Sequence, residues 1–113
     1  MPLSGIPGCT MSEMPFANAD RYGYTEPSIL QNAPVASGVY GVYTGTYGTR
    51  WIYVGETTDI RRRLLEHFRE RGTCIQQYIP AGFTFEVCAE QLRPERQRLL
   101  IEELNPICNQ AWG

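Results

Sequence analysis

The chain of 113 residues carries a net charge of −2 at pH 7, and 42 % of its residues are hydrophobic. This length suffices for one folded domain with a single modest core, and no apolar run approaches the roughly 18 residues of a membrane span. The acidic balance argues against strong, nonspecific affinity for nucleic acid, because dedicated DNA-binding domains are usually basic.

The first 37 residues are predicted to form a partly irregular N-terminal extension. Residues 1–22 are rich in Pro, Gly, Ser and Met and show no hydrophobic periodicity, which is typical of loop or disorder. Residues 27–32 could form a short helical turn before Pro34. The start of the chain lacks a charged segment followed by a continuous apolar one, so we expect no signal peptide.

Residues 38–113 are predicted to form the folded domain, which begins with two strands joined by a hairpin turn. The first strand runs from Gly38 to about Tyr43 and the second from Trp51 to Val54, with a Gly- and Thr-rich turn between them. In residues 83–87, Phe and Val alternate with Thr and Glu. That alternation predicts a third strand with one buried face.

Three helices are predicted after the hairpin. Asp59 is a good N-cap for a helix from Ile60 to about Arg71, which Gly72 ends. A shorter helix is predicted at residues 74–79, and a last helix at residues 94–104 has a proline in its first turn. The predicted fold is therefore α+β: a small three-stranded antiparallel sheet flanked by helices.

The four cysteines are scattered along the chain and lack the close spacing of a metal site. In a chain for which no secretion signal is expected, such cysteines are interpreted as reduced, buried thiols. This predicts four free thiols and a cytoplasmic location. The residues concerned are Cys9, Cys74, Cys88 and Cys108.

Two tyrosine-bearing tripeptides are the most informative feature of the sequence. Gly38-Val39-Tyr40 and Tyr53-Val54-Gly55 are separated by 12 residues, and Arg63 and His67 follow one helical turn apart. On the predicted helix, Arg63 and His67 line one edge of the apolar stripe. A phenol, an imidazole and a guanidinium on one surface suit the handling of a phosphodiester, because arginine makes bidentate contacts to phosphate oxygens.

With Asn105-Pro106 and Asn109 near the C-terminus, the ordered motifs resemble those of the GIY-YIG nuclease superfamily. The resemblance covers about residues 37–109. Members of this family include homing endonucleases, some restriction enzymes and the incision domain of bacterial excision repair. Starting the first tripeptide at Gly41-Val42-Tyr43 would shorten the linker to nine residues. The first motif tyrosine is therefore Tyr40 or Tyr43, and the usual start of the strand favours Tyr40.

The resemblance implies hydrolysis of DNA phosphodiesters with one Mg²⁺ or Mn²⁺ ion. Tyr40, with His67, would help a water molecule lose its proton, and Arg63 would neutralise the scissile phosphate. Tyr53 and Asn109 would position reacting groups. The candidates for substrate binding are Gly55, Arg62 and Arg71.

One departure from the family pattern concerns the metal. The family binds its divalent ion through a single glutamate on a helix before the late asparagine, and this position falls on Gln97. Leu100, Ile101 and Leu104 lie three, four and seven positions further on, so Gln97 is predicted to face inward with them. Because Mg²⁺ prefers carboxylate oxygen and water, we expect no tight metal binding and impaired or absent hydrolysis.

Two alternatives to a nuclease use the same fold. One is a non-catalytic module that binds nucleic acid, and the other is a protein-interaction domain. All ten basic residues are arginines, and five of them lie between Arg61 and Arg71, but residues 38–113 are neutral overall. The missing carboxylate and this neutrality favour the alternatives, whereas the complete set of motif residues favours a nuclease.

Overall fold

The computed structural model describes residues 16, 20–45 and 50–109. Two short elements, β1 and α1, precede the motif hairpin, and a 3₁₀ turn leads into the last helix. The elements in chain order are β1 (Tyr22–Gly23), α1 (Glu26–Asn32), β2 (Gly38–Thr44), β3 (Arg50–Thr57), α2 (Ile60–Arg69), α3 (Cys74–Gln77), β4 (Gly82–Val87), the 3₁₀ turn (Glu90–Leu92) and α4 (Arg93–Leu104).

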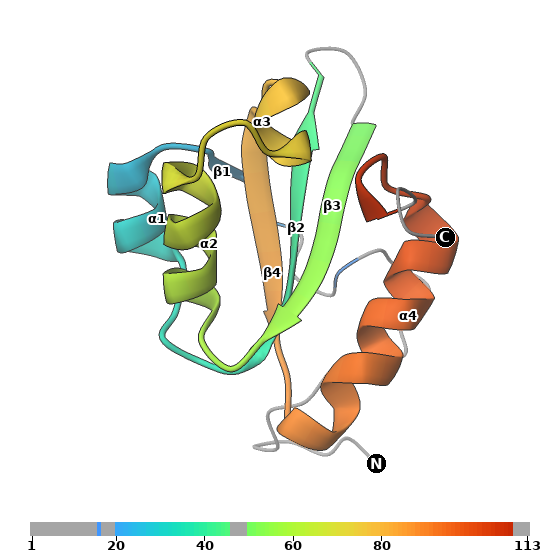
Figure 1. Cartoon of the computed structure of the whole chain (residues 1–113). Coiled ribbons are helices and arrows are strands. Elements are labelled where there is room, and N and C mark those ends of the chain that lie inside the picture. The colour runs from blue at the N-terminus through green and yellow to red at the C-terminus, as the bar shows by residue number, and fades with distance from the viewer. Residues whose placement is uncertain (1–15, 17–19, 46–49, 110–113) are drawn as a thin grey trace.

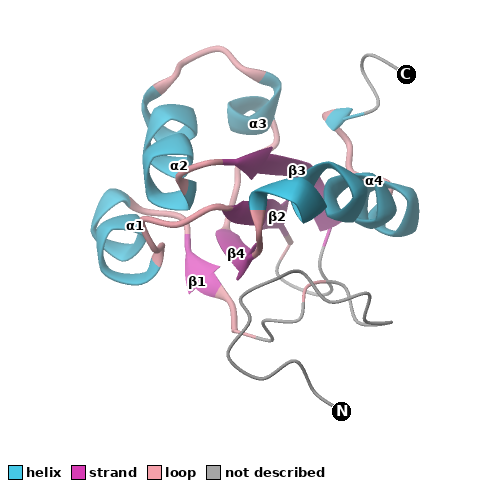
Figure 2. Cartoon of the chain, turned by 90° about the horizontal axis from the view of Figure 1, so that it is seen from below, coloured by secondary structure: helices cyan, strands magenta, loops and turns pink. Residues whose placement is uncertain are grey.

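The strands form one antiparallel sheet in the order β1-β4-β2-β3. Helices α1, α2 and α3 lie on one side of this sheet and α4 lies on the other (Figures 1 and 2). The predicted α+β class is confirmed, but the prediction of three strands is wrong by one. The missed strand, β1, pairs only Tyr22 with Phe83 and Gly23 with Gly82, which is too short to produce a periodic signal.

Each face of the sheet carries its own hydrophobic cluster. The cluster under α1, α2 and α3 includes Ile29, Tyr40, Val42, Ile60 and Leu64. The cluster under α4 comprises Phe16, Val39, Trp51, Val54, Cys88 and Leu100. Both faces are therefore covered, and β4 departs from its predicted pattern: Thr84 and Glu86 are buried as well as Phe83.

Local sequence accounts for the helix boundaries. The predicted N-cap of α2 is confirmed, because the carboxylate of Asp59 accepts a hydrogen bond from the backbone N–H of Arg62 at 3.0 Å. The helix ends at Arg69, two residues earlier than predicted, and α3 ends at Gln77 instead of residue 79. No helix in the described part of the chain is both long enough and apolar enough to cross a membrane.

The residues just before the motif hairpin hold α2 in place. The predicted helical turn forms as α1, and Ile29 and Ala33 are fully buried against the rest of the core. The backbone N–H of Ile60 donates to the carbonyl of Ala36 at 3.0 Å, and Nε of Arg61 donates to the carbonyl of Ala33 at 2.8 Å. The segment before Gly38 therefore helps to orient the helix that carries Arg63 and His67.

Two ion pairs fasten the first turns of α4 to the sheet. Arg96 donates from Nε and Nη2 to the two oxygens of Glu86, each at 3.1 Å, and both side chains are buried. Arg93 pairs with Glu56 at 3.0 Å. Glu56 and Glu86 flank Val39 on the neighbouring strands, so the two carboxylates lie on the same face of the sheet.

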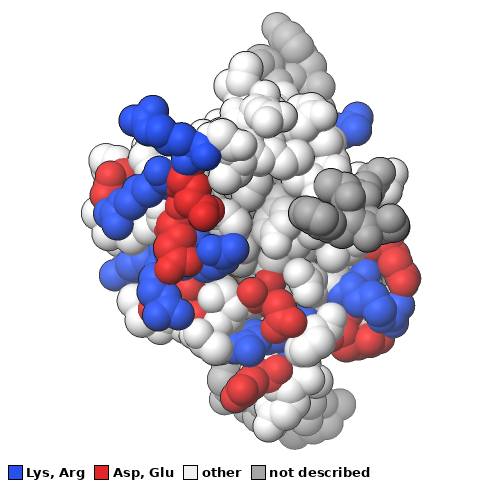
Figure 3. All heavy atoms as spheres, viewed as in Figure 1, with Lys and Arg blue, Asp and Glu red and all other residues white. Residues whose placement is uncertain are grey.

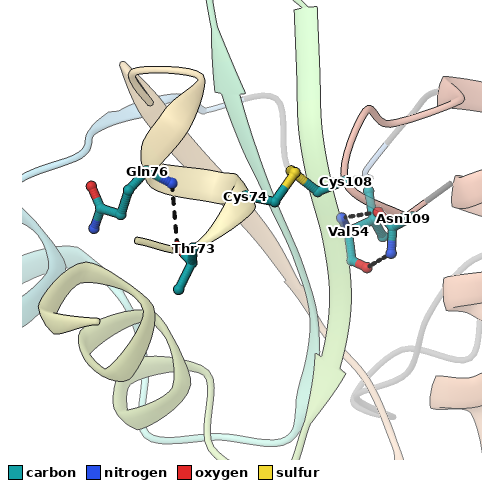
Figure 4. The surroundings of a disulfide bond; sticks show 6 residues. All are labelled: Val54, Thr73, Cys74, Gln76, Cys108 and Asn109. Carbon is teal, nitrogen blue, oxygen red and sulfur yellow. Dashed lines mark hydrogen bonds between the residues drawn. A yellow bond between two sulfur atoms is a disulfide. The ribbon is translucent and has the colours of Figure 1, made fainter. Parts of the chain in front are cut away.

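The prediction of free thiols is wrong for the described cysteines. Cys74 and Cys108 form a disulfide between the start of α3 and the segment after α4 (Figure 4). Cys88 is also disulfide-bonded, whereas Cys9 lies outside the described residues. The pairing could not be predicted, because Cys74 and Cys108 are 34 residues apart and only the folded sheet brings their Cα atoms within 5.9 Å.

Candidate functional site

The two tripeptides lie side by side at the centre of the site. In the β2–β3 register Tyr40 is opposite Gly55, and the phenol ring of Tyr40 lies directly over this glycine. A Cβ atom at Gly55 would come within 2.4 Å of the Tyr40 hydroxyl. The glycine of the second tripeptide is therefore what allows the tyrosine of the first to occupy its position.

The hydroxyl of Tyr40 and Nε2 of His67 are 2.7 Å apart, and both side chains are buried. Burial lowers the pKa of His67 to about 4, to which the positive charge of Arg63 contributes, so the ring is neutral at pH 7. Burial also raises the pKa of the Tyr40 hydroxyl well above its usual range. Nδ1 of His67 lies 3.7 Å from the Glu70 carboxylate, which favours the proton on Nδ1 and leaves Nε2 to accept from Tyr40.

Tyr53 and Arg63 complete the group. The Tyr53 ring meets His67 edge-on, with 5.4 Å between centroids, and lies 6.1 Å from the Tyr40 ring. Tyr53 is half-buried, and the Arg63 side chain is 39 % exposed and pairs with Glu66 at 2.9 Å. Tyr40, Tyr53, Arg63 and His67 thus come together as predicted from their spacing, with Tyr53 and Arg63 on the accessible side.

Tyr43, the alternative first motif tyrosine, belongs to the opposite face of the sheet. Its register partners are Trp51 and Gly82, and its ring packs against Trp51 with 5.5 Å between centroids. A β-bulge between Val42 and Tyr43 accompanies this arrangement. Of the two candidates for the first motif tyrosine, Tyr40 is therefore the one that contacts His67.

Gly55→Ala is expected to displace Tyr40, because the new methyl group and the phenol cannot share the same space. Overpacking of this kind costs about 1–3 kcal/mol of stability. Chemical denaturation would give the cost, and loss of the Tyr40–His67 hydrogen bond would shift the His67 ring resonances in NMR spectra. Gly23→Ala is the matched control, since nothing lies within 4 Å of a Cβ at Gly23. Equal stability of the two variants would contradict the close approach.

His67 is expected to make the fold sensitive to acid. Its pKa falls from an ordinary 6.5 to about 4 in the fold, so between these values the unfolded chain binds a proton that the folded chain does not. The full contribution of this group to the free energy of unfolding is therefore present above pH 6.5. It is lost as the pH falls towards 4, which lowers the stability by about 3 kcal/mol. Urea denaturation between pH 4 and 8 measures the loss. In His67→Gln this component should disappear, and an unchanged pH dependence would refute the assignment.

Gln97 lies half-buried on α4, and its Nε2 approaches the carbonyl oxygen of Val54 at a long 3.4 Å. Its neighbour Arg96 is the charged side chain that α4 buries, paired with Glu86. Sequence analysis missed this ion pair. The available signal was the placement of Arg96 one turn before the buried Leu100, on the inward stripe.

The residues present do not fit a divalent metal ion. Mg²⁺ and Mn²⁺ favour carboxylate oxygens, whereas the implied ligand here is the neutral amide of Gln97. Glu56, the acidic residue next to Gly55, is already paired with Arg93. Among residues 16, 20–45 and 50–109, no group of three or more His, Cys, Asp or Glu side chains could hold a metal.

Asn109 lies beside β3 with both ends of its amide in use. Its Oδ1 accepts from the backbone N–H of Val54 at 2.8 Å, and its Nδ2 donates to the Val54 carbonyl at 2.9 Å (Figure 4). Val54 is the middle residue of the second tripeptide. In this arrangement Asn109 positions the strand that carries Tyr53.

The arginines of α2 are largely matched by acidic neighbours. Blue and red side chains alternate over this helix in Figure 3. Arg62 and Arg63 both pair with Glu66, and Arg69 pairs with Glu26. Arg71 has no ion pair within the described part of the chain. The positive potential near the site is therefore lower than the number of arginines suggests.

No protein-family model matches this chain, and neither a curated protein nor a solved structure matches it. The functional interpretation therefore depends on the geometry of the site. That geometry offers a neutral tyrosine–histidine pair behind one accessible phenol and one accessible guanidinium. Such groups can bind a phosphodiester and accept or pass on a proton.

Proposed function

We propose that this chain is a GIY-YIG-type endonuclease domain whose hydrolysis of DNA is impaired by the amide at Gln97. The observation that carries the proposal is the packing of Tyr40 over Gly55, with its hydroxyl 2.7 Å from His67. Tyr40 thereby contacts the second tripeptide at Gly55 and helix α2 at His67. The order of the motif hairpin, the helix of Arg63 and the last helix with Gln97 adds support, because the GIY-YIG resemblance implies the same order.

In this proposal Arg63 and Tyr53 meet the substrate first. The Arg63 guanidinium neutralises a phosphate, and the Tyr53 hydroxyl orients it. Behind them, the Tyr40 hydroxyl donates a hydrogen bond to Nε2 of the neutral His67. As the attacking water molecule passes its proton to the Tyr40 oxygen, the hydroxyl proton of Tyr40 passes to His67, so Tyr40 is never left as a phenolate. Asn109 holds the backbone of Val54, the residue next to Tyr53, through both ends of its amide.

A non-catalytic module that binds nucleic acid is the second candidate. Gln97 favours it, since a neutral amide is a poor ligand for a hard cation. The same Arg63 and Tyr53 would then hold a strand without cutting it. Restoration of the acid at Gln97, discussed below, separates this candidate from the first.

The disulfides also bear on where the protein works. The cytoplasmic location was predicted from reduced cysteines, and that premise does not hold for Cys74, Cys88 and Cys108. Stable disulfides are typical of oxidising compartments. We therefore propose that the chain acts in an oxidising environment.

Arg63→Ala is expected to weaken binding to nucleic acid about 10- to 100-fold, since one charge-assisted contact to phosphate contributes about 1.5–3 kcal/mol. Fluorescence anisotropy with labelled DNA and RNA at low salt would measure the change in affinity. The slope of log affinity against log salt concentration should become less steep by about one, which corresponds to one lost phosphate contact. Arg98→Ala is the matched control, because Arg98 is exposed on α4 and pairs with Glu95 and Glu102. Equal affinities for Arg63→Ala and the parent chain would reject the proposed role.

A further inference from the structure

A hollow opens at the C-terminal end of α2, next to the site. Its volume is about 540 Å³, within the range of pockets that bind small ligands. The motif residues and the proposed chemistry do not use it, although Arg71, a candidate for substrate binding, lies in its lining. Its lining consists of Phe68, Arg69, Glu70, Arg71, Gly72 and Gln76.

The lining offers one aromatic ring, two guanidinium groups, one carboxylate from Glu70 and an amide. The Phe68 ring is supported from behind by Tyr24, with 5.5 Å between centroids. Gln76 is fixed, because its Nε2 donates to the carbonyls of His67 at 3.1 Å and Phe68 at 3.0 Å. Its Oε1 accepts no hydrogen bond from the described residues and is therefore available to a donor on a ligand.

One guanidinium in the hollow is open to an anion, although the Glu70 carboxylate lowers the net positive charge of the lining. Arg69 is engaged with Glu26, whereas Arg71 is exposed and has no acidic partner among the described residues. An unpaired guanidinium can make two parallel hydrogen bonds to a phosphate. Arg71 is thus the lining residue best suited to hold a phosphate.

Glu70 connects the hollow to the Tyr40–His67 pair. Its carboxylate lines the hollow and lies 3.7 Å from Nδ1 of His67. A strand whose phosphate rests at Arg63 would therefore continue over the end of α2, where the hollow begins. Arg63 lies on α2, and Arg71 follows two residues after the end of this helix.

We propose that the hollow binds one nucleotide unit of a nucleic-acid strand, with its base against Phe68 and its phosphate on Arg71. This inference rests on the proposed function and adds a second point of contact to the site. A base stacks on an aromatic ring whatever its identity, and Oε1 of Gln76 can accept from an exocyclic amino group. The combination of ring, guanidinium and acceptor suits a nucleotide better than a bare anion, which needs no aromatic face.

The test compares Arg71→Gln and Phe68→Leu with the parent chain. Binding of a labelled single-stranded oligonucleotide is followed by anisotropy, and binding of nucleoside 5′-monophosphates by NMR titration. We expect Arg71→Gln to weaken oligonucleotide binding about tenfold, and Phe68→Leu about fivefold or more. Arg50→Gln is the control, since Arg50 is also an exposed arginine, lies at the start of β3 and does not line the hollow. Circular dichroism verifies that each variant is folded.

The possible outcomes separate this inference from the proposed function. Oligonucleotide binding that depends on Arg63 but is unchanged in Arg71→Gln and Phe68→Leu would overturn the inference alone. An equal loss of oligonucleotide affinity in Arg71→Gln and Arg50→Gln would also overturn it. Binding would then depend on the net charge of the chain and not on the position of the arginine. Monophosphate binding that depends on Arg71, without oligonucleotide binding, would support a nucleotide site and contradict the nuclease. Binding of neither probe to the parent chain would reject both.

Discussion

Gln97→Glu is expected to bind Mg²⁺ or Mn²⁺ and to cleave DNA at least about 100-fold faster than the parent chain. The substitution supplies a carboxylate at the position where the GIY-YIG resemblance implies a metal ligand, close to the carbonyl oxygen of Val54. Without metal, the half-buried charge should lower stability, since a carboxylate facing inward is costly unless paired. Isothermal titration with metal, thermal unfolding with and without metal, and cleavage of a plasmid measure the three effects.

Two further variants make the result for Gln97 decisive. Gln97→Ala removes the amide without adding charge and should neither bind metal nor cleave. Gln97→Glu combined with Arg63→Ala should bind metal but lose most of the gained activity. Equal cleavage by the parent chain and Gln97→Glu would show that another group holds the metal. Metal binding without cleavage would favour the module that only binds nucleic acid.

Removal of the Cys74–Cys108 disulfide is expected to cost about 4 kcal/mol. The bond closes a loop of 34 residues, which restricts the unfolded chain, and an entropic estimate for a loop of this length gives that magnitude. The double variant Cys74→Ser, Cys108→Ser tests the pair without leaving an unpaired thiol, and urea denaturation gives the loss in the free energy of unfolding.

The same variant separates this disulfide from the one at Cys88. Dithiothreitol should destabilise the parent chain by more than the double substitution does, because it also reduces the bond at Cys88. In the double variant, dithiothreitol should then lower stability only by the contribution of Cys88. If the double variant unfolds at the same urea concentration as the parent, the Cys74–Cys108 bond does not constrain the chain.

The parts of the fold and site that could be predicted depend on local patterns. Asp59 marks the start of α2 by its capping side chain, and the four-residue spacing of Arg63 and His67 puts them on one helical edge. The pairing of two strands across a short hairpin then brings Tyr40 over Gly55. Each of these steps follows from residues close together in the sequence.

The parts that could not be predicted depend on contacts made only in the folded chain. Glu86 and Arg96 are on different elements, and nothing in a strand that alternates Phe with Glu indicates that its polar face will also be covered. The disulfide between Cys74 and Cys108 requires α3 and the last segment to approach β3. His67 was placed at the margin of the stripe, but it is 5 % exposed because Tyr40 supplies a polar partner inside the core.

The last described residues of the chain protect the fold from unwanted association. β3 is the outermost strand on its side of the sheet, and such a strand offers unpaired N–H and C=O groups to any other extended chain. Here the backbone N–H groups of Ile107 and Cys108 donate to the carbonyls of Trp51 at 3.1 Å and Ile52 at 2.7 Å. The side-chain amide of Asn109 accepts from the backbone N–H of Val54. Reduction of the Cys74–Cys108 disulfide would loosen the attachment of this segment to β3. The exposed edge of β3 could then pair with other chains, so the protein could aggregate without unfolding globally.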